Sequence, residues 1–179
     1  TDLGTPAELL KRLSKARYPF LLESARFHPV TGRYSFLGWD PFLVLKSKGD
    51  WVWMEQGTKR ESMRGEPLKI LQRLLSQHRS PKLDGMPPFG GGAVGYFSYE
   101  VRHFFEKLPN FAKDDLKLPD MFFLFVDRLV VFDHLTKKSW MVVNVPSEEG
   151  GKGYQKACDT FLEMASIFQK APSDVFTNP

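Results

Sequence analysis

The sequence predicts an α+β fold in which antiparallel sheets are flanked by helices. Two observations carry this prediction. Apolar residues recur at helical spacing near both ends of the chain and once more in its first half. Between these segments lie short runs rich in β-branched and aromatic residues, separated by Gly, Pro and Asp turns. Because most of these runs follow one another without an intervening helix, they indicate antiparallel meanders and not βαβ units.

Three segments carry the helical pattern. At Thr5-Pro6-Ala7-Glu8, a capping threonine, a proline in the first turn and a glutamate at the capping-box position predict a helix over about residues 5–17. A second helix is expected from Pro67 to near His78, with leucines on its buried face. The third covers residues 154–169, and Cys158 lies on its apolar stripe, which predicts an inert core thiol.

The strand pattern is clearest in the apolar run Met121–Val126, which we expect to be an interior strand covered on both faces. A short helix is expected at residues 101–107, before Pro109. The predicted strands are 20–23, 33–37, 42–47, 51–55, 92–99, 121–126, 128–134 and 139–145.

Length and composition are those of a globular protein: 179 residues, of which 42% are hydrophobic and 14% aromatic. No apolar stretch reaches the ~20 residues that span a bilayer, and the first residues lack a signal-peptide layout. Cys158 is the only cysteine, so an internal disulfide is excluded and a cytoplasmic location is expected.

The formal charge of +4 is mild, and the basic residues are scattered in pairs such as Lys11-Arg12 and Lys137-Lys138. Nucleic-acid binding requires a concentrated basic face with aromatic residues beside it. We therefore expect a mixed, solvated surface that binds neither nucleic acid nor membrane.

The glycine-rich stretch PPFGGGAVGYFSYE, residues 87–100, invites a phosphate-binding interpretation. A P-loop would need a lysine and a serine or threonine directly after its glycines, and neither is present. Gly90, Gly92 and Gly95 match the dinucleotide spacing, but the preceding Pro87 and Pro88 do not belong to a parallel strand. The stretch favours close backbone packing within or beside a sheet.

Catalytic and metal-binding patterns are absent from the sequence. The four histidines are dispersed, and the pair His103 and Glu106 supplies too few ligands for a metal site. No G-x-S-x-G nucleophile elbow occurs. We expect no catalytic residue and no metal site in this chain.

Residues 20–42 contain the most suggestive polar pattern. Glu23 and Ser24 end one predicted strand, and Tyr34 and Ser35 begin the next, so a hairpin-like return would bring them together beside Leu22. A carboxylate, hydroxyl groups and an aromatic wall suit a zwitterionic amino acid. The alternative, favoured by spacing alone, is that Glu23 forms a cross-strand ion pair with Arg33 and the serines only end strands.

Several motifs then appear in one order between about residues 19 and 145: FLLES, GRYSFLGWDPF, PPFGGGAVGYFSYE, DDLKLPD and LVVFDH. Together they resemble the N-terminal region of component I of anthranilate synthase and of aminodeoxychorismate (para-aminobenzoate) synthase. The resemblance implies an α+β fold with two orthogonally packed antiparallel sheets flanked by helices.

The resemblance also implies what the parent protein does. Enzymes of this family, lyases or transferases of tryptophan and folate biosynthesis, convert chorismate with ammonia from a glutamine amidotransferase subunit, component II, and with magnesium. Their chorismate- and magnesium-binding residues belong to a larger C-terminal domain. Residues 1–170 are then expected to be the N-terminal domain and 171–179 a linker toward an absent catalytic domain. The start at Thr1 suggests a piece of a longer protein, and this chain alone is expected to be inactive.

In anthranilate synthases of this family, the L-L-E-S segment and the following strand line a tryptophan pocket used for feedback inhibition. The residues carried over by matching motif are Leu22, Glu23, Ser24, Tyr34 and Ser35. The strand block ending at Trp140 inclines the sequence slightly toward the aminodeoxychorismate branch, whereas LLES is typical of anthranilate synthases. The alternative function is a free-standing amino-acid-sensing module.

Overall fold

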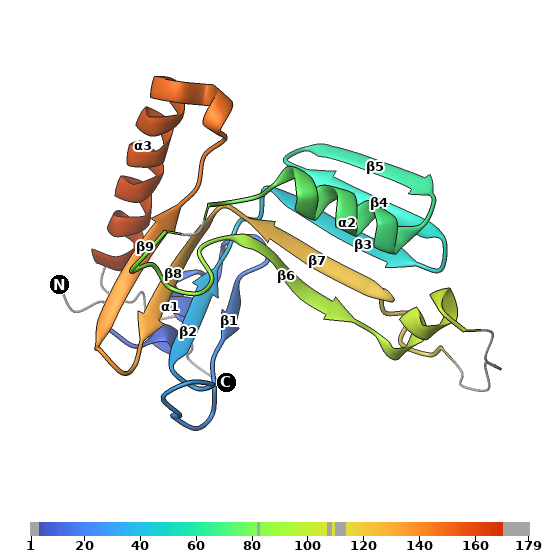
Figure 1. Cartoon of the computed structure of the whole chain (residues 1–179), viewed down its shortest axis with the longest axis horizontal. Coiled ribbons are helices and arrows are strands. Elements are labelled where there is room, and N and C mark those ends of the chain that lie inside the picture. Colours follow the sequence, from blue (N-terminus) through green and yellow to red (C-terminus); the bar gives the residue numbers. More distant parts are fainter. Residues whose placement is uncertain (1–3, 82, 107–108, 110–113, 170–179) are drawn as a thin grey trace, which may run out of the picture. The chain divides into compact units, whose positions relative to one another are not determined.

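The computed structural model describes residues 4–81, 83–106, 109 and 114–169. The chain forms two compact units. The first takes its residues from Thr1–Pro41, Ser80–Gly91 and Val126–Pro179, and the second from Phe42–Arg79 and Gly92–Phe125. Each unit combines an antiparallel sheet with helices (Figure 1). The predicted α+β class is therefore confirmed.

The first unit contains a four-stranded sheet in the order β1-β2-β8-β9. Its strands are β1 (Phe20–Leu22), β2 (Tyr34–Gly38), β8 (Arg128–Asp133) and β9 (Lys138–Val143). All three neighbouring pairs are antiparallel. Because β2 pairs with β8, the register joins segments about a hundred residues apart in the chain.

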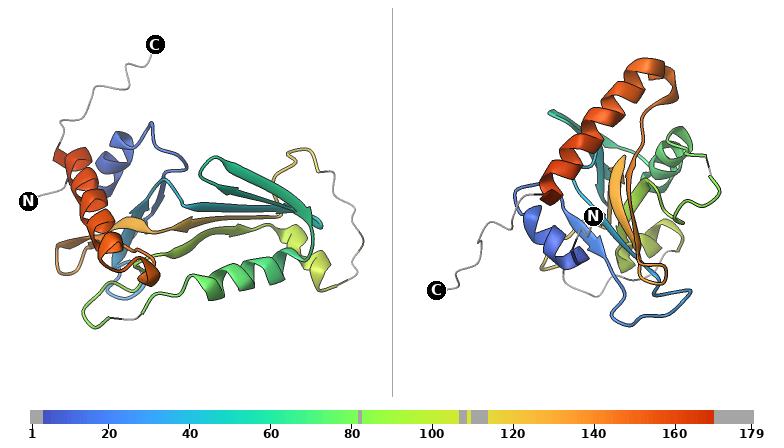
Figure 2. Two further views of the ribbon diagram at one scale, coloured as in Figure 1. Left: turned by 90° about the horizontal axis from the view of Figure 1, so that it is seen from above. Right: turned by 90° about the vertical axis from the view of Figure 1, so that its left-hand side faces the viewer.

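Helices α1 (Pro6–Arg12) and α3 (Gly150–Gln169) contribute to the core of the first unit. Leu9 of α1 and Met164 of α3 are almost fully buried together with Leu37 and Val130 of the sheet. A short 3-10 helix, η2 (Ser147–Glu149), leads into α3. Figure 2 shows α3 in red beside α1 in blue.

The predicted capping box is present, since Thr5 and Glu8 each accept a hydrogen bond from the other's backbone N–H. The predicted end of α1 at residue 17 is wrong, because the helix stops at Arg12. Tyr18 has a φ of 48°, and a residue before proline is excluded from the helical region by clash with the proline ring. Pro19 thus keeps the helix from continuing through Tyr18, but it does not explain the end at Arg12.

The second unit contains a five-stranded sheet in the order β5-β4-β3-β7-β6. Its elements are β3 (Leu43–Lys48), β4 (Trp51–Gln56), β5 (Lys59–Arg64), α2 (Pro67–Gln77), β6 (Gly92–Phe97), the 3-10 helix η1 (Tyr99–Phe104) and β7 (Met121–Val126). The apolar β7 is an interior strand, as predicted. The expected short helix begins and ends earlier than residues 101–107, and residue 107 lies outside the described residues.

Helix α2 begins and ends where predicted and covers one face of this sheet (Figure 2). Leu71 and Leu74 are buried against Leu45, Val52 and Phe125 of the strands. Strand β5, by contrast, was not predicted. Its polar sequence KRESMR pairs along its whole length with β4 and leaves most of its side chains exposed.

The glycine-rich stretch packs its backbone closely, as predicted. A Cβ built on Gly95 would overlap the carbonyl oxygen of Phe122 and lie 2.8 Å from the Cα of Phe123. Only glycine therefore allows β6 to approach β7 at this point. Gly91 and Gly92 have φ values of 149° and 127°, in a region that favours glycine.

Helix α3 starts four residues earlier than predicted, and its apolar stripe is only partly buried. Phe168 packs in the core, whereas Tyr154 and Leu162 are 72% and 66% exposed. Cys158 is half-buried and lines a surface groove, so the expectation of a core thiol is wrong. Within the described residues, none of the helices combines the length and apolar character needed to cross a bilayer.

Candidate functional site

The candidate site lies at one end of the four-stranded sheet. Because β1, β2 and β8 run antiparallel to their neighbours, the end of β1, the start of β2 and the end of β8 meet there (Figure 1). The register pairs Leu22 with Phe36 and Tyr34 with Asp133. Glu23 and His134 directly follow their strands, so both come to lie beside Ser35.

Three polar side chains form a chain of contacts at this position. The Oγ of Ser35 lies 2.7 Å from Nε2 of His134 and 3.4 Å from Oε1 of Glu23. Ser35 is fully buried, whereas Glu23 is exposed. The backbone N–H of His134 also donates to the carbonyl of Arg33 at 2.9 Å, which holds the histidine beside β2. The Glu23 carboxylate thus lies at the end of the sheet, within reach of the Ser35 hydroxyl.

The structure brings Glu23 and Ser35 together, as the hairpin-like return predicted, but places the other predicted residues differently. Ser24 donates from its hydroxyl to the carbonyl of Thr31 at 3.4 Å, closing the loop between β1 and β2. Leu22 and Tyr34 lie on the sheet face opposite Ser35, because successive strand residues alternate between faces. Leu22 is 45% exposed.

Arg33 engages Asp133 and not Glu23, so the alternative of a Glu23–Arg33 ion pair is wrong. Its Nε and Nη2 donate to the two carboxylate oxygens at 2.9 and 2.6 Å. The guanidinium also lies 4.9 Å from the ring centre of Tyr34. These bonds hold the pKa of Asp133 far below its ordinary value, and further bonds from Thr136 and the N–H of Leu135 lower it as well. The same pairing raises the pKa of Arg33.

This pair predicts a specific loss of stability in acid. A carboxyl group whose pKa is lowered on folding stabilises the fold fully above its unfolded pKa of about 3.9. That stabilisation is lost progressively as the pH falls from there toward the lowered pKa of the folded state. We expect Asp133→Asn to lower the urea midpoint at about pH 6 and to make the midpoint fall less than in the unmodified protein toward about pH 3.

The matched control is Asp84→Asn, since Asp84 is exposed in a turn. It is expected to follow the unmodified protein at every pH. Equal pH dependence of the Asp133 and Asp84 variants would contradict a stabilising role for the Arg33 pair.

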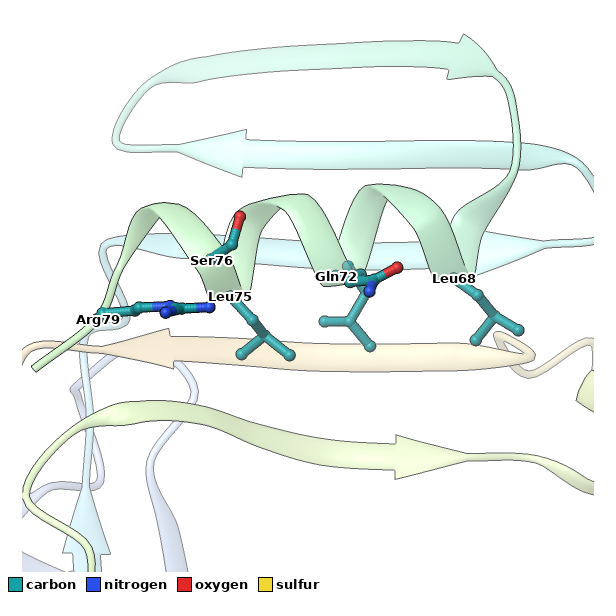
Figure 3. Close-up of a pocket in the computed structure, with 6 residues that line it drawn as sticks. Leu68, Gln72, Leu75, Ser76 and Arg79 are labelled. Atoms are coloured by element: carbon teal, nitrogen blue, oxygen red, sulfur yellow. The ribbon is translucent and has the colours of Figure 1, made fainter.

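Two surface depressions of about 430 Å³ lie elsewhere. One runs along α2, where Leu68 and Leu75 point to the same side of the helix (Figure 3). The other lies between β9 and α3, beside Cys158 and Phe161. Both are open and mainly apolar, and neither contains a residue predicted for the amino-acid site. The depression along α2 also has Gln72, Ser76 and Arg79 in its lining, whereas the lining of the second is apolar apart from Cys158.

Metal ligation has little support within the described part of the chain. His103 contacts Glu100 at 2.9 Å and not Glu106, with which the sequence paired it. Nowhere among the described residues do three His, Cys, Asp or Glu side chains lie close enough to hold a metal ion. No metal ligand set is therefore assigned among the described residues, and no chemical step through magnesium is derived from them.

His134 is the member of the cluster that the sequence reasoning missed. It stands 99 residues from Ser35 in the chain, and only the pairing of β2 with β8 brings the two together. The available signal was a polar residue directly after the buried strand LVVFD. Without the register, however, that position could not be assigned to the end of β2.

Comparison with known proteins shows which family the chain belongs to. The family model described as chorismate binding enzyme matches residues 22–176. The chain is 37% identical to anthranilate synthase component 1 of Acetivibrio thermocellus over 80% of its own length and 29% of that protein. It is 32% identical to aminodeoxychorismate synthase component 1 of Bacillus subtilis over 75% of its own length and 28% of that protein.

A solved structure agrees with these matches. The crystal structure of anthranilate synthase component I from Streptococcus pneumoniae TIGR4 superposes with a TM-score of 0.63 and 26% identity, covering 96% of this chain and 36% of that one. The chain spans about a third of the length of the curated relatives it matches.

Proposed function

Because the chain belongs to the chorismate-binding enzyme family, we propose that it is the N-terminal, non-catalytic domain of a synthase that aminates chorismate. We further propose that the end of its four-stranded sheet binds an amino acid, tryptophan, as a regulatory ligand. The matched relatives are about three times longer than this chain, which supports a parent protein with a further domain. Component II and magnesium would serve that parent, and a single cysteine supports a cytoplasmic location.

The observation that carries the ligand proposal is the Glu23–Ser35 contact at 3.4 Å. A carboxylate held at an exposed sheet end can accept hydrogen bonds from a ligand's ammonium group, and charge-assisted bonds of this kind are the stronger ones. Ser24 can donate to the ligand's carboxylate only by giving up its bond to the carbonyl of Thr31. The roles of Leu22 and Tyr34 stay predictions, since a ligand at Glu23 would have to reach around the sheet edge to touch them.

A turnover measurement tests the non-catalytic role. Incubated with chorismate, ammonia and magnesium, this chain alone is expected to form neither anthranilate nor aminodeoxychorismate, because the family's reaction residues are assigned to the remaining two thirds of the parent. The full-length parent is the positive control. Product formation by this chain at a rate comparable with that of the parent would contradict the proposal.

The parent synthase forms either anthranilate or aminodeoxychorismate. The sequence inclined slightly toward aminodeoxychorismate synthase, but the identities, 37% to an anthranilate synthase and 32% to an aminodeoxychorismate synthase, do not support that preference. Assaying the parent for both products would decide between them.

The second candidate function is a free-standing amino-acid-sensing module, which the Glu23–Ser35 contact fits equally well. The reading frame after Pro179 separates the two. A long continuation would support the synthase, and an immediate stop codon would support the sensor.

A further inference from the structure

We propose that His134 is a positioning residue of the amino-acid site: its Nε2–H donates to Ser35 and thereby directs the Ser35 hydroxyl at Glu23. This inference rests on the proposed function for its effect on ligand binding. The positions of the His134 Nε2 hydrogen and the Ser35 hydroxyl hydrogen are inferred from the contacts of Ser35 alone and do not depend on a ligand.

The number of hydrogens in the cluster decides the direction of each hydrogen bond. Ser35 has one hydroxyl hydrogen and contacts two groups, Nε2 of His134 at 2.7 Å and Oε1 of Glu23 at 3.4 Å. An ionised carboxylate can only accept hydrogen bonds. If Nε2 carried a lone pair, Ser35 would donate to it, and two oxygens without a hydrogen between them would then face each other at Glu23.

The other tautomer satisfies both contacts. When Nε2 carries the hydrogen, it donates to Ser35 Oγ, and the hydroxyl is free to donate to Glu23. Burial gives this choice energetic weight, because Ser35 is fully buried and a buried polar group without a suitable partner is costly.

For a ligand, the consequence is the orientation of the Glu23 carboxylate. A hydrogen bond from Ser35 to Oε1 fixes one oxygen of the Glu23 carboxylate and leaves Oε2 available for an ammonium group. Glu23 is otherwise an exposed side chain on a loop, and ordering a free glutamate side chain on binding costs conformational entropy. His134 therefore prepares Glu23 for the ligand without touching it.

The first test needs no ligand. Nitrogen-15 NMR of the chain labelled at its four histidines should show His134 with its hydrogen on Nε2 at alkaline pH, where imidazole is neutral. The His134→Gln spectrum assigns the signal by its absence. Ser35→Ala should reduce the population of this tautomer toward that of a free histidine. A hydrogen on Nδ1 in the unmodified chain would overturn the inference.

The second test uses tryptophan titrations of the full-length protein. His134→Ala is expected to weaken binding about three- to tenfold, whereas His134→Gln, whose amide N–H can still donate to Ser35, should stay within about twofold. Equal weakening in both variants, or in neither, would overturn the positioning role. Absence of tryptophan binding to the unmodified protein would instead contradict the proposed function and leave the NMR result as the test of the proton arrangement.

Discussion

Gly95→Ala is expected to destabilise the second unit by about 2–3 kcal/mol, within the range for added carbon atoms that force the backbone to shift. The added Cβ would overlap the backbone carbonyl of Phe122 and approach the Cα of Phe123 to 2.8 Å. These are backbone atoms of the neighbouring strand β7 and cannot move aside as a flexible side chain can. Either β6 separates from β7, or the sheet shifts as a whole.

Urea unfolding and amide hydrogen exchange measure this effect. The urea midpoint should fall, and exchange across β7 should become faster as its neighbour loosens. The matched control is Gly90→Ala in the same glycine-rich stretch, because a Cβ there would meet only a Val142 methyl group at 3.7 Å, an ordinary contact. That variant should stay within about 0.5 kcal/mol of the unmodified protein. Equal stability of the two variants would contradict a close-packing role for Gly95.

Local signals made much of the fold predictable. The Thr5–Glu8 capping box fixed the start of α1, and the apolar run of β7 identified an interior strand. Strand β5 could not be predicted in the same way. Its residues are polar, and it is a strand because its backbone bonds to β4 in a hairpin and not because its side chains favour burial. Pro19 limits the helix only at Tyr18, and no local signal accounts for its end at Arg12.

Some contacts of the candidate site could likewise be predicted from the sequence, and others could not. The approach of Glu23 to Ser35 follows from a return between neighbouring strands, so the sequence could predict it. His134 and the Arg33–Asp133 pair depend on the β2–β8 register, which joins residues about a hundred positions apart. No local pattern specifies that register. Strand alternation does predict that Leu22 and Tyr34 lie on the sheet face opposite Ser35. The family motif alone had assigned all three residues to one pocket.

Glu23→Gln is expected to weaken tryptophan binding by at least about tenfold in the full-length protein. The substitution keeps the shape of the side chain and the contact with Ser35 but removes the charge. A hydrogen bond to a charged group contributes about 1.5–3 kcal/mol, and about 1.4 kcal/mol corresponds to a tenfold change in affinity. Glu148→Gln is the matched control, since Glu148 is an exposed carboxylate in η2.

Calorimetric titration of these proteins with tryptophan and with N-acetyltryptophan tests the central claim most directly, because only tryptophan carries an ammonium group. We expect the unmodified protein and Glu148→Gln to bind tryptophan at least about tenfold more tightly than the acetylated compound, and Glu23→Gln to lose this preference. An undiminished preference in Glu23→Gln would contradict the assignment of Glu23 as the ammonium-binding group.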